Sequence, residues 1–281
     1  GLAFTDNRTE GVDGSLRLIG RGRWGWSLLG YTQRREFESS FAATDPDRTE
    51  ARRTSLQYDV PGQAIGWSAE VRPPASQGLE WRFGVDGRRA VGRSAELGSF
   101  VAGAATRDRL SGGRTFNGGA FAEATVTSGA LTVSGAARLD RWRIAGGISR
   151  DRNLATGALV SDQKFPARSG WRPTARAAAG VELGQGWTVR SAAYLGWRLP
   201  TLNELFRPFR AGSDATAANP LLDPERSSGV EAGIRWRTDT AAVELTAFSN
   251  RLRGAIANVT LGEGPGVFPG VGFVPAGGVY R

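Results

Sequence analysis

One connecting segment of the sequence carries side chains that could bind a ligand. The stretch R-L-P-T-L-N-E-L-F-R-P-F-R-A-G, residues 198–212, interleaves arginines with leucines and phenylalanines between two strand-like segments. It is too rich in large apolar residues for an ordinary solvated loop, and its arginines would attract an anion by electrostatic steering. The candidate ligand-binding residues in this connection are Arg207, Phe209, Arg210, Asp214 and Asn219.

The residue inventory excludes most enzymatic chemistry. The chain contains no cysteine and no histidine, so it lacks a thiol nucleophile, the usual general base and the commonest metal ligand. Catalysis by a Ser-His-Asp triad is therefore impossible, and nothing else in the sequence positions a nucleophile or a base. We expect no enzyme, no cofactor and no metal site.

The positive charge of the chain does not indicate a nucleic-acid partner. The net charge is +9, and Lys164 is the only lysine, so arginine carries almost all of it. A nucleic-acid footprint normally gathers such charge on one patch or helix. Here the arginines are spread through nearly every segment, and we expect no binding of nucleic acid.

Three further motifs have simple structural interpretations. A formal G-x-G-x-x-G match at residues 20–25 is followed by strand-like sequence rather than a helix, which favours a hairpin turn over a dinucleotide site. The carboxylates of residues 45–50 do not have EF-hand spacing, so a solvated loop is preferred to a cation site. The Gly/Pro-rich residues 262–273 predict a mobile loop, with ligand contact as the alternative.

The elements that must position these residues are strands with a period of two. In residues 187–198 one face carries Trp187, Val189, Leu195 and Trp197, while the other carries two arginines. A tilted strand of this length between aromatic ends matches the ~25 Å lipid-facing band of a membrane barrel. Residues 65–72, 80–86, 230–237 and 243–248 alternate in the same way. No apolar run is long enough for a transmembrane helix.

The connections between these strands alternate in length, which is typical of an up-and-down barrel. Short connections are expected at residues 20–23, 61–63, 127–130, 184–186 and 238–240, and long ones at residues 39–48, 95–114, 149–170, 199–226 and 259–281. This rhythm predicts an all-β, antiparallel transmembrane barrel region with about eleven or twelve strands and no domain boundary.

The segment 198–226 and the strand after it resemble the barrel of TonB-dependent outer-membrane receptors. The resemblance rests on a P-T-L-x-E-L-F stretch, an N-P-x-L-x-P-E stretch and a following G-x-E-x-G strand, and it is specific over residues 186–262. The motif residues to which we assign a structural role are Pro200, Thr201, Leu202, Glu204, Leu205, Phe206, Pro220, Pro224 and Glu225. Their prolines stiffen the exit from the strand, and their leucines are expected to pack the loop onto its neighbours.

This resemblance implies a partial barrel over residues 1–281, with about half of the family's 22 strands and without its plug domain. It implies a location in the Gram-negative outer membrane. The implied function of the whole receptor is uptake of a scarce solute, such as a ferric siderophore or similar metal chelate, by plug-gated transport. The implied partners are the energy-transducing TonB complex, reached through the missing plug, the outer-membrane lipid and lipopolysaccharide, and the small-molecule ligand.

Two other interpretations stay open at this point. A passive porin or structural barrel would conduct ions without energy input. A soluble all-β binding domain would fold without detergent, and it would have to bury the outward tryptophans, among them Trp67, Trp81 and Trp236.

Overall fold

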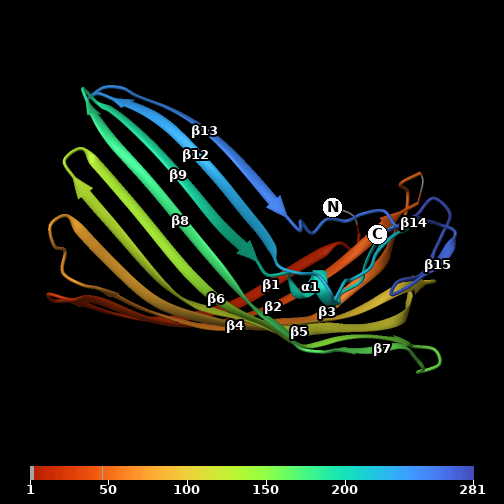
Figure 1. Ribbon diagram of the computed structural model, residues 1–281. Helices are drawn as coiled ribbons and strands as arrows, with labels where there is room; N and C mark the ends of the chain where they lie inside the picture. The colour runs from red at the N-terminus through yellow and green to blue at the C-terminus, as the bar shows by residue number, and fades with distance from the viewer. Residues whose placement is uncertain (1–2, 46) are drawn as a thin grey trace.

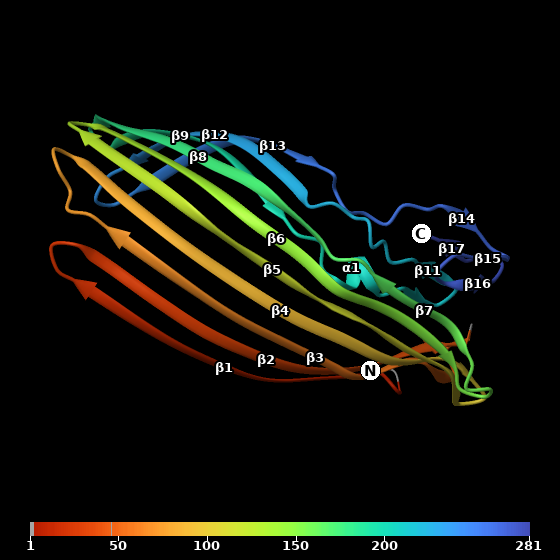
Figure 2. The same ribbon diagram turned by 60° about the horizontal axis from the view of Figure 1, so that its bottom comes forward.

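The chain folds into one long antiparallel sheet that curves into an open trough (Figures 1 and 2). The computed structural model describes residues 3–45 and 47–281. Ten strands follow one another in sequence order across the sheet: β1 (Asp6–Arg21), β2 (Gly25–Thr44), β3 (Ala51–Arg72), β4 (Leu79–Val101), β5 (Ala104–Ser128), β6 (Leu131–Asn153), β8 (Arg168–Gly184), β9 (Trp187–Arg198), β12 (Glu225–Arg237) and β13 (Ala242–Arg253). An eleventh strand, β7 (Leu159–Phe165), pairs with the last part of β6, past the point where the pairing of β6 with β8 stops at Arg168. This arrangement confirms the predicted all-β, up-and-down architecture and its strand number.

The two ends of the sheet differ. At one end, here called the turn end, neighbouring strands are joined by connections of a few residues, including residues 129–130, 185–186 and 238–241. At the other, the loop end, lie the connection 199–224 and the segment after β13 (Figure 1). No helix among the described residues is long and apolar enough to cross a membrane.

The two faces of the sheet also differ. The pleat sends successive side chains to opposite faces. On β9 and β12, Val189, Leu195 and Val230 point to the convex face and are exposed. Arg190 and Tyr194 point to the concave face, where they bond to Glu244 and Asn250 of β13. The convex face is therefore apolar and the concave face polar, as a barrel wall in lipid requires.

Two expectations about the connections were wrong. The short turn expected at residues 61–63 lies within β3, because Pro61 sits where the ladder to β4 is interrupted between Asp59 and Gly62. An interrupted ladder tolerates a proline, which has no N–H to donate. The long loop expected at residues 95–114 is instead the far part of β4 and β5, joined by a tight turn at Ala102 and Gly103.

Much of the other two long loops in the first half is also strand. β2 runs on to Thr44, and residues 149–170 contain the end of β6, all of β7 and the start of β8. Apolar and polar residues do not alternate regularly in these extensions, so they lack the period of two by which the strands were recognised. Among the described residues, no cluster of three or more carboxylates is arranged to hold a metal ion, in the turn of residues 45–50 or elsewhere.

The motif segment forms a single helical turn, α1 (Leu202–Phe206), which the sequence analysis did not expect. Thr201 and Glu204 make a capping box: the Thr201 hydroxyl accepts from the Glu204 N–H, and the Glu204 carboxylate accepts from the Thr201 N–H at 2.7 Å. These bonds satisfy the free N–H groups of so short a helix.

The apolar side of α1 lies in the main buried cluster of the molecule. Leu205 and Phe206 pack against Trp142 and Ile144 of β6, and Phe206 stacks on Phe165 at 5.2 Å between ring centres. The cluster thus fixes the connection 199–224 to the concave wall.

Trp197 is the exception among the predicted outward tryptophans. It is half-buried beside this cluster, and its indole N–H donates to Asp140 at 3.0 Å. The pairing of β9 with β8 ends at Leu195, so the strand is free to turn inward before Pro200. Trp67, Trp81 and Trp187 remain exposed on the convex face.

The last part of the chain is ordered rather than a mobile loop. Residues 262–273 include β14 (Gly262–Glu263), β15 (Gly266–Phe268) and the start of β16 (Gly272–Val274). β17 (Val279–Tyr280) pairs with β14 and, in parallel, with β11 (Asp214–Thr216), which pairs with β10 (Phe209–Ala211). The two segments at the loop end therefore form one small sheet.

Both glutamates around Arg198 have lowered pKa values. Burial alone would raise the pKa of Glu204, but hydrogen bonds from Arg198 and Thr201 outweigh it and hold the pKa below its ordinary value. Hydrogen bonds from Arg198 and from the Ile256 N–H lower the pKa of Glu225. The ionised carboxylates thus stabilise the exit of the loop from the sheet.

The packing of Phe206 predicts the effect of one added methyl group. A Cβ at Gly147 would lie 2.4 Å from Phe206 Cζ, whereas one at Gly62 meets nothing within 4 Å. We expect Gly147→Ala in the detergent-solubilised receptor to loosen the loop by about 1–3 kcal/mol, measured as faster hydrogen exchange in residues 202–222. Gly62→Ala is the matched control. Equal exchange in the two variants would show that Phe206 does not anchor the loop.

The lowered pKa values of Glu204 and Glu225 predict that the attachment of the loop to the sheet depends on pH. Because both folded-state pKa values are depressed, the stabilisation is present above the unfolded value of about 4.3 and is lost as the pH falls through the folded values. Hydrogen exchange in residues 199–206, corrected for its intrinsic pH dependence, should reveal weaker docking at pH 3 than at pH 7. In Glu204→Gln the difference should shrink. An unchanged difference in that variant would rule out Glu204 as its source.

Candidate functional site

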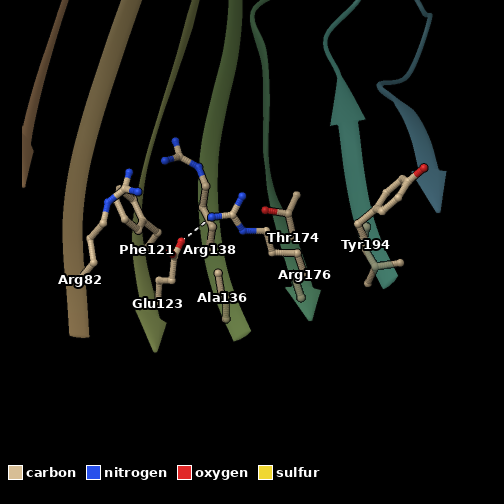
Figure 3. Close-up of a pocket in the computed structure, with 11 residues that line it drawn as sticks. Arg82, Phe121, Glu123, Ala136, Arg138, Thr174, Arg176 and Tyr194 are labelled. Atoms are coloured by element: carbon tan, nitrogen blue, oxygen red, sulfur yellow. Dashed lines mark hydrogen bonds and ion pairs between the residues drawn. The ribbon is translucent and has the colours of Figure 1, made fainter. Parts of the chain in front are cut away.

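Two hollows of the concave face differ in electrostatic character. The first, the wall hollow, lies midway along the strands and has a volume of about 300 Å³. Arg82, Phe121, Glu123, Arg138, Arg176 and Tyr194 project into it from five neighbouring strands (Figure 3). The second, the outer cavity, lies at the loop end between the sheet, α1 and residues 268–273, and measures about 670 Å³.

In the wall hollow every arginine is matched by a carboxylate. Arg82 pairs with Glu70 at 3.0 Å, and Arg176 pairs with Glu123 at 2.5 Å. Arg138 lies between Asp86 and Asp140 and bonds to both. The three arginines of this hollow thus have four carboxylate partners. The hollow therefore offers no excess positive charge to attract an anion.

The outer cavity has more arginines than carboxylates. Arg207 bonds to Glu96, and Arg109 lies 3.6 Å from Glu96 and 3.4 Å from Asp151. Arg107 lies 3.5 Å from Asp151. Arg150, which also lines the cavity, pairs with Asp162 at 3.1 Å. The other three arginines thus share two carboxylates before Arg210 is counted.

Arg210 has no carboxylate partner among residues 3–45 and 47–281. Its guanidinium donates to the carbonyl oxygens of Val271 and Phe273, the latter at 2.7 Å. Burial lowers the pKa of Arg210 below its ordinary value, and repulsion from Arg109 acts in the same direction. An arginine nevertheless stays protonated in proteins, so the cavity carries two positive charges in excess.

Aromatic side chains supply the apolar part of this cavity. Phe165 and Phe206 form its floor as a stacked pair. Phe268, which stacks on Tyr280 at 4.7 Å, and Phe273, which is 59% exposed, line its outer side. The cavity thus sets four phenylalanines among a lining that is otherwise rich in arginine and serine, so it can contact both the apolar and the charged parts of a small molecule.

The structure brings together only part of the predicted ligand set. Arg207 and Arg210 both line the outer cavity. Phe209 lies beside it: Arg207 covers its ring at 5.5 Å, and its ring meets Phe41 edge-on at 6.4 Å. Asp214 instead pairs with Arg281 at 2.9 Å. The Asn219 side chain accepts from the Leu221 N–H at 2.9 Å. Whether any of these five contacts a ligand stays a prediction.

The second half of the motif is held by β8. Arg168 donates to the carbonyl oxygens of Pro220 and Leu222 at 2.7 and 3.0 Å and pairs with Asp223 at 2.8 Å. Pro224 and Glu225 are buried where β12 begins. These contacts, like those of α1, tie the loop to the sheet.

Sequence reasoning missed half of the cavity. Glu96, Arg107, Arg109 and Asp151 lie in segments that were interpreted as loops, and Phe268 and Phe273 lie in the supposedly mobile tail. The alternation of charged residues in A-T-R-D-R-L, residues 105–110, was the signal that could have identified a strand with an inward-facing arginine row.

Comparison with known proteins agrees with this architecture. The family described as "TonB dependent receptor-like, beta-barrel" matches residues 2–279. No curated protein sequence matches significantly.

Several solved structures share the fold. The ferric yersiniabactin uptake receptor FyuA from Yersinia pestis superposes with a TM-score of 0.66 at 14% identity, over 89% of this chain and 37% of its own. The copper transporter OprC gives 0.68 at 16%, over 88% and 39%. The ferric-catecholate import receptor Fiu from E. coli K12 gives 0.67 at 16%, over 90% and 42%. The chain therefore spans about two fifths of the length of these structures.

The family match over almost the whole chain, together with the apolar convex face and polar concave face, excludes the soluble binding domain. Members of this family are outer-membrane β-barrels of Gram-negative bacteria, and they are transport proteins rather than enzymes, as the sequence analysis expected. The chain belongs to the β-barrel family of the TonB-dependent receptors.

Proposed function

We propose that this chain forms part of the barrel of a receptor that takes up a scarce anionic solute, such as a ferric siderophore or a similar metal chelate. The observation that carries the proposal is the excess of arginine in the outer cavity, where Arg207 and Arg210 meet an aromatic floor. Positive charge in a recessed, low-dielectric cleft focuses the field and raises the local concentration of an anion.

The similar structures support the choice of cargo. By their names, FyuA is a ferric yersiniabactin uptake receptor and Fiu imports ferric catecholates, while OprC is a copper transporter. A metal complex is the common element of the three names. Ferric complexes of acidic chelators carry negative charge and aromatic or aliphatic groups, which suits both features of the outer cavity.

The remaining parts of the proposal concern the whole receptor. β1 and β13 form the edges of the described sheet, and a sheet in lipid must have its edge groups paired. We propose that further strands close the barrel, that a plug domain fills it, and that the TonB complex supplies energy through that plug. The charge-paired wall hollow would then face the plug, and the outer cavity would face the medium.

The proposed anion site predicts the effect of replacing Arg207 and Arg210. In the complete receptor, Arg207→Gln combined with Arg210→Gln should weaken binding of an acidic ferric chelate about 100-fold or more, because each charge-assisted hydrogen bond contributes about 1.5–3 kcal/mol. Calorimetric or fluorescence titration measures the dissociation constant. Glu96 keeps Arg109 as a partner in this variant, so the wall should stay folded.

Arg93→Gln is the matched control, because Arg93 pairs with Asp59 on the opposite face of β4 and does not line the cavity. Its affinity should equal that of the wild type. If the double variant also bound with wild-type affinity, the anion site would have to lie elsewhere.

The second prediction separates energy-coupled uptake from a passive pore. A receptor-deletion strain that expresses the complete receptor should accumulate the labelled chelate, and a protonophore or loss of TonB should abolish accumulation while surface binding persists. Accumulation that survives both treatments would favour the porin.

A further inference from the structure

The outer side of the outer cavity is formed by a small hairpin. It consists of β15, β16 and the turn between them, residues 266–274, and we call it the cavity hairpin. In the described part of the chain, β15 and β16 pair only with each other, from Gly266 opposite Val274 to Phe268 opposite Gly272. The cavity hairpin is therefore not a member of the small sheet that joins β10, β11, β17 and β14.

Apolar packing fixes only part of the cavity hairpin. Val274 is fully buried, and Phe268 stacks on Tyr280 of β17 at 4.7 Å between ring centres. The tip, residues 269–273, is mostly exposed to solvent. Because the stabilisation from apolar contact is proportional to the area removed from water, packing contributes little to holding the tip against the cavity.

Arg210 supplies the hydrogen bonds that hold this tip. Its Nη2 atom donates to the carbonyl oxygens of Val271 and Phe273 at 2.5 and 2.7 Å. Among residues 3–45 and 47–281, no other hydrogen bond joins the cavity hairpin to another segment. The position of the tip therefore depends on one guanidinium group of β10.

The place of these bonds on the guanidinium group limits what else Arg210 can bind. A guanidinium group offers a carboxylate two parallel N–H bonds in two ways, from Nη1 with Nη2 or from Nε with Nη2. Nη2 takes part in both arrangements, and its two hydrogens already have the two carbonyl acceptors of the cavity hairpin. An anion can therefore bind Arg210 through two parallel bonds only by displacing a carbonyl group of the hairpin.

Arg207 has a partner of a different kind. Its Nη2 atom bonds to Glu96 of β4, a buried carboxylate that belongs to the wall of the sheet. Displacing Glu96 would leave a buried charge with Arg109 alone, at 3.6 Å. Displacement at Arg210 instead frees neutral carbonyl groups at an exposed tip, where water can accept them. A carboxylate also forms a stronger bond with a guanidinium group than a neutral carbonyl does, so the exchange at Arg210 is the favourable one.

We propose that the cavity hairpin is an internal competitor for Arg210. Its carbonyl groups occupy the arginine in the free receptor, and an anionic solute displaces them and releases the tip. The inference rests on the proposed function, because it requires an anion in the outer cavity.

The competition makes the release selective. An anion with two acceptor oxygens can replace the carbonyl groups, whereas chloride, a single atom, cannot form the two parallel bonds. Because Phe268 and Phe273 line the outer side of the cavity, release of the tip also loosens that wall and admits a larger chelate.

The test is amide hydrogen exchange of residues 266–274 in the complete receptor, with ferric citrate as the anionic chelate. Saturating ferric citrate should raise the exchange rate of these residues about tenfold, roughly the factor that corresponds to one lost charge-assisted hydrogen bond. A loop that simply closed over its ligand would show the opposite change. Sodium chloride at the same ionic strength should leave the rate unchanged.

Two arginine variants identify the residue responsible. Arg210→Gln should raise the exchange rate of residues 266–274 without chelate, and ferric citrate should add nothing further. Arg207→Gln is the matched control: it weakens binding, but at equal occupancy by ferric citrate the hairpin should still be released. Equal responses of the two variants would contradict the assignment to Arg210.

A change in the hairpin itself gives an independent check. Gly272 has a φ of +78° and a Cβ there would meet nothing within 4 Å, so Gly272→Val strains the backbone without a clash. It should release the tip in the absence of chelate. Gly157→Val is the matched control, because Gly157 has a φ of +70° and equal space in the turn between β6 and β7.

The outcomes separate this inference from the proposed function. Unchanged or slower exchange of residues 266–274 at saturating ferric citrate would overturn the internal competitor and leave the anion site standing. A calorimetric titration in which ferric citrate did not bind would remove the anion site, and the inference with it.

Discussion

The structure depends on one constraint: every backbone N–H and C=O that crosses lipid must be bonded within the protein. The strands between β1 and β13 meet it by pairing with a neighbour on each side, and the outer edges of β1 and β13 need further strands to meet it. Once the ladder is continuous, the pleat allows only two destinations for a side chain, so apolar and charged residues separate into two faces. The register that pairs Trp187 with Trp236 also pairs Arg190 with Gly233 on the opposite face.

Whether an arginine is paired with a carboxylate depends on its position along the sheet. In the wall hollow of the concave face, Arg82, Arg138 and Arg176 are paired with carboxylates. Farther out the pairing becomes incomplete, because Arg210 is bonded only to carbonyl groups in the outer cavity. This departure from neutrality lies at the loop end, where a mobile anion can approach.

The strands could be predicted from the sequence because apolar and polar residues alternate wherever one face of a strand contacts lipid, as between Trp187 and Leu195. Where that contact ends, the signal ends as well, so the far parts of β4 and β5 were mistaken for a loop although Glu96 and Arg109 face each other there. Pro61 was misleading because an interrupted ladder tolerates proline. The motif identified the family and its anchoring loop, but α1 depends on the reciprocal bonds of Thr201 and Glu204. The cavity could not be predicted, since it joins residues as distant as Glu96 and Phe273.

The most direct test of this account is an accessibility scan along β12 in the complete, membrane-reconstituted receptor. This chain contains no cysteine, so spin labels can be attached at single cysteines placed from residue 229 to residue 235. The account predicts that collisions with oxygen peak at residues 230, 232 and 234, and that a water-soluble nickel chelate does not reach these positions. The intervening residues should show the opposite preference or protection from both reagents. Collision rates without a period of two, or nickel access to residues 230, 232 and 234, would contradict the assignment of the convex face to lipid.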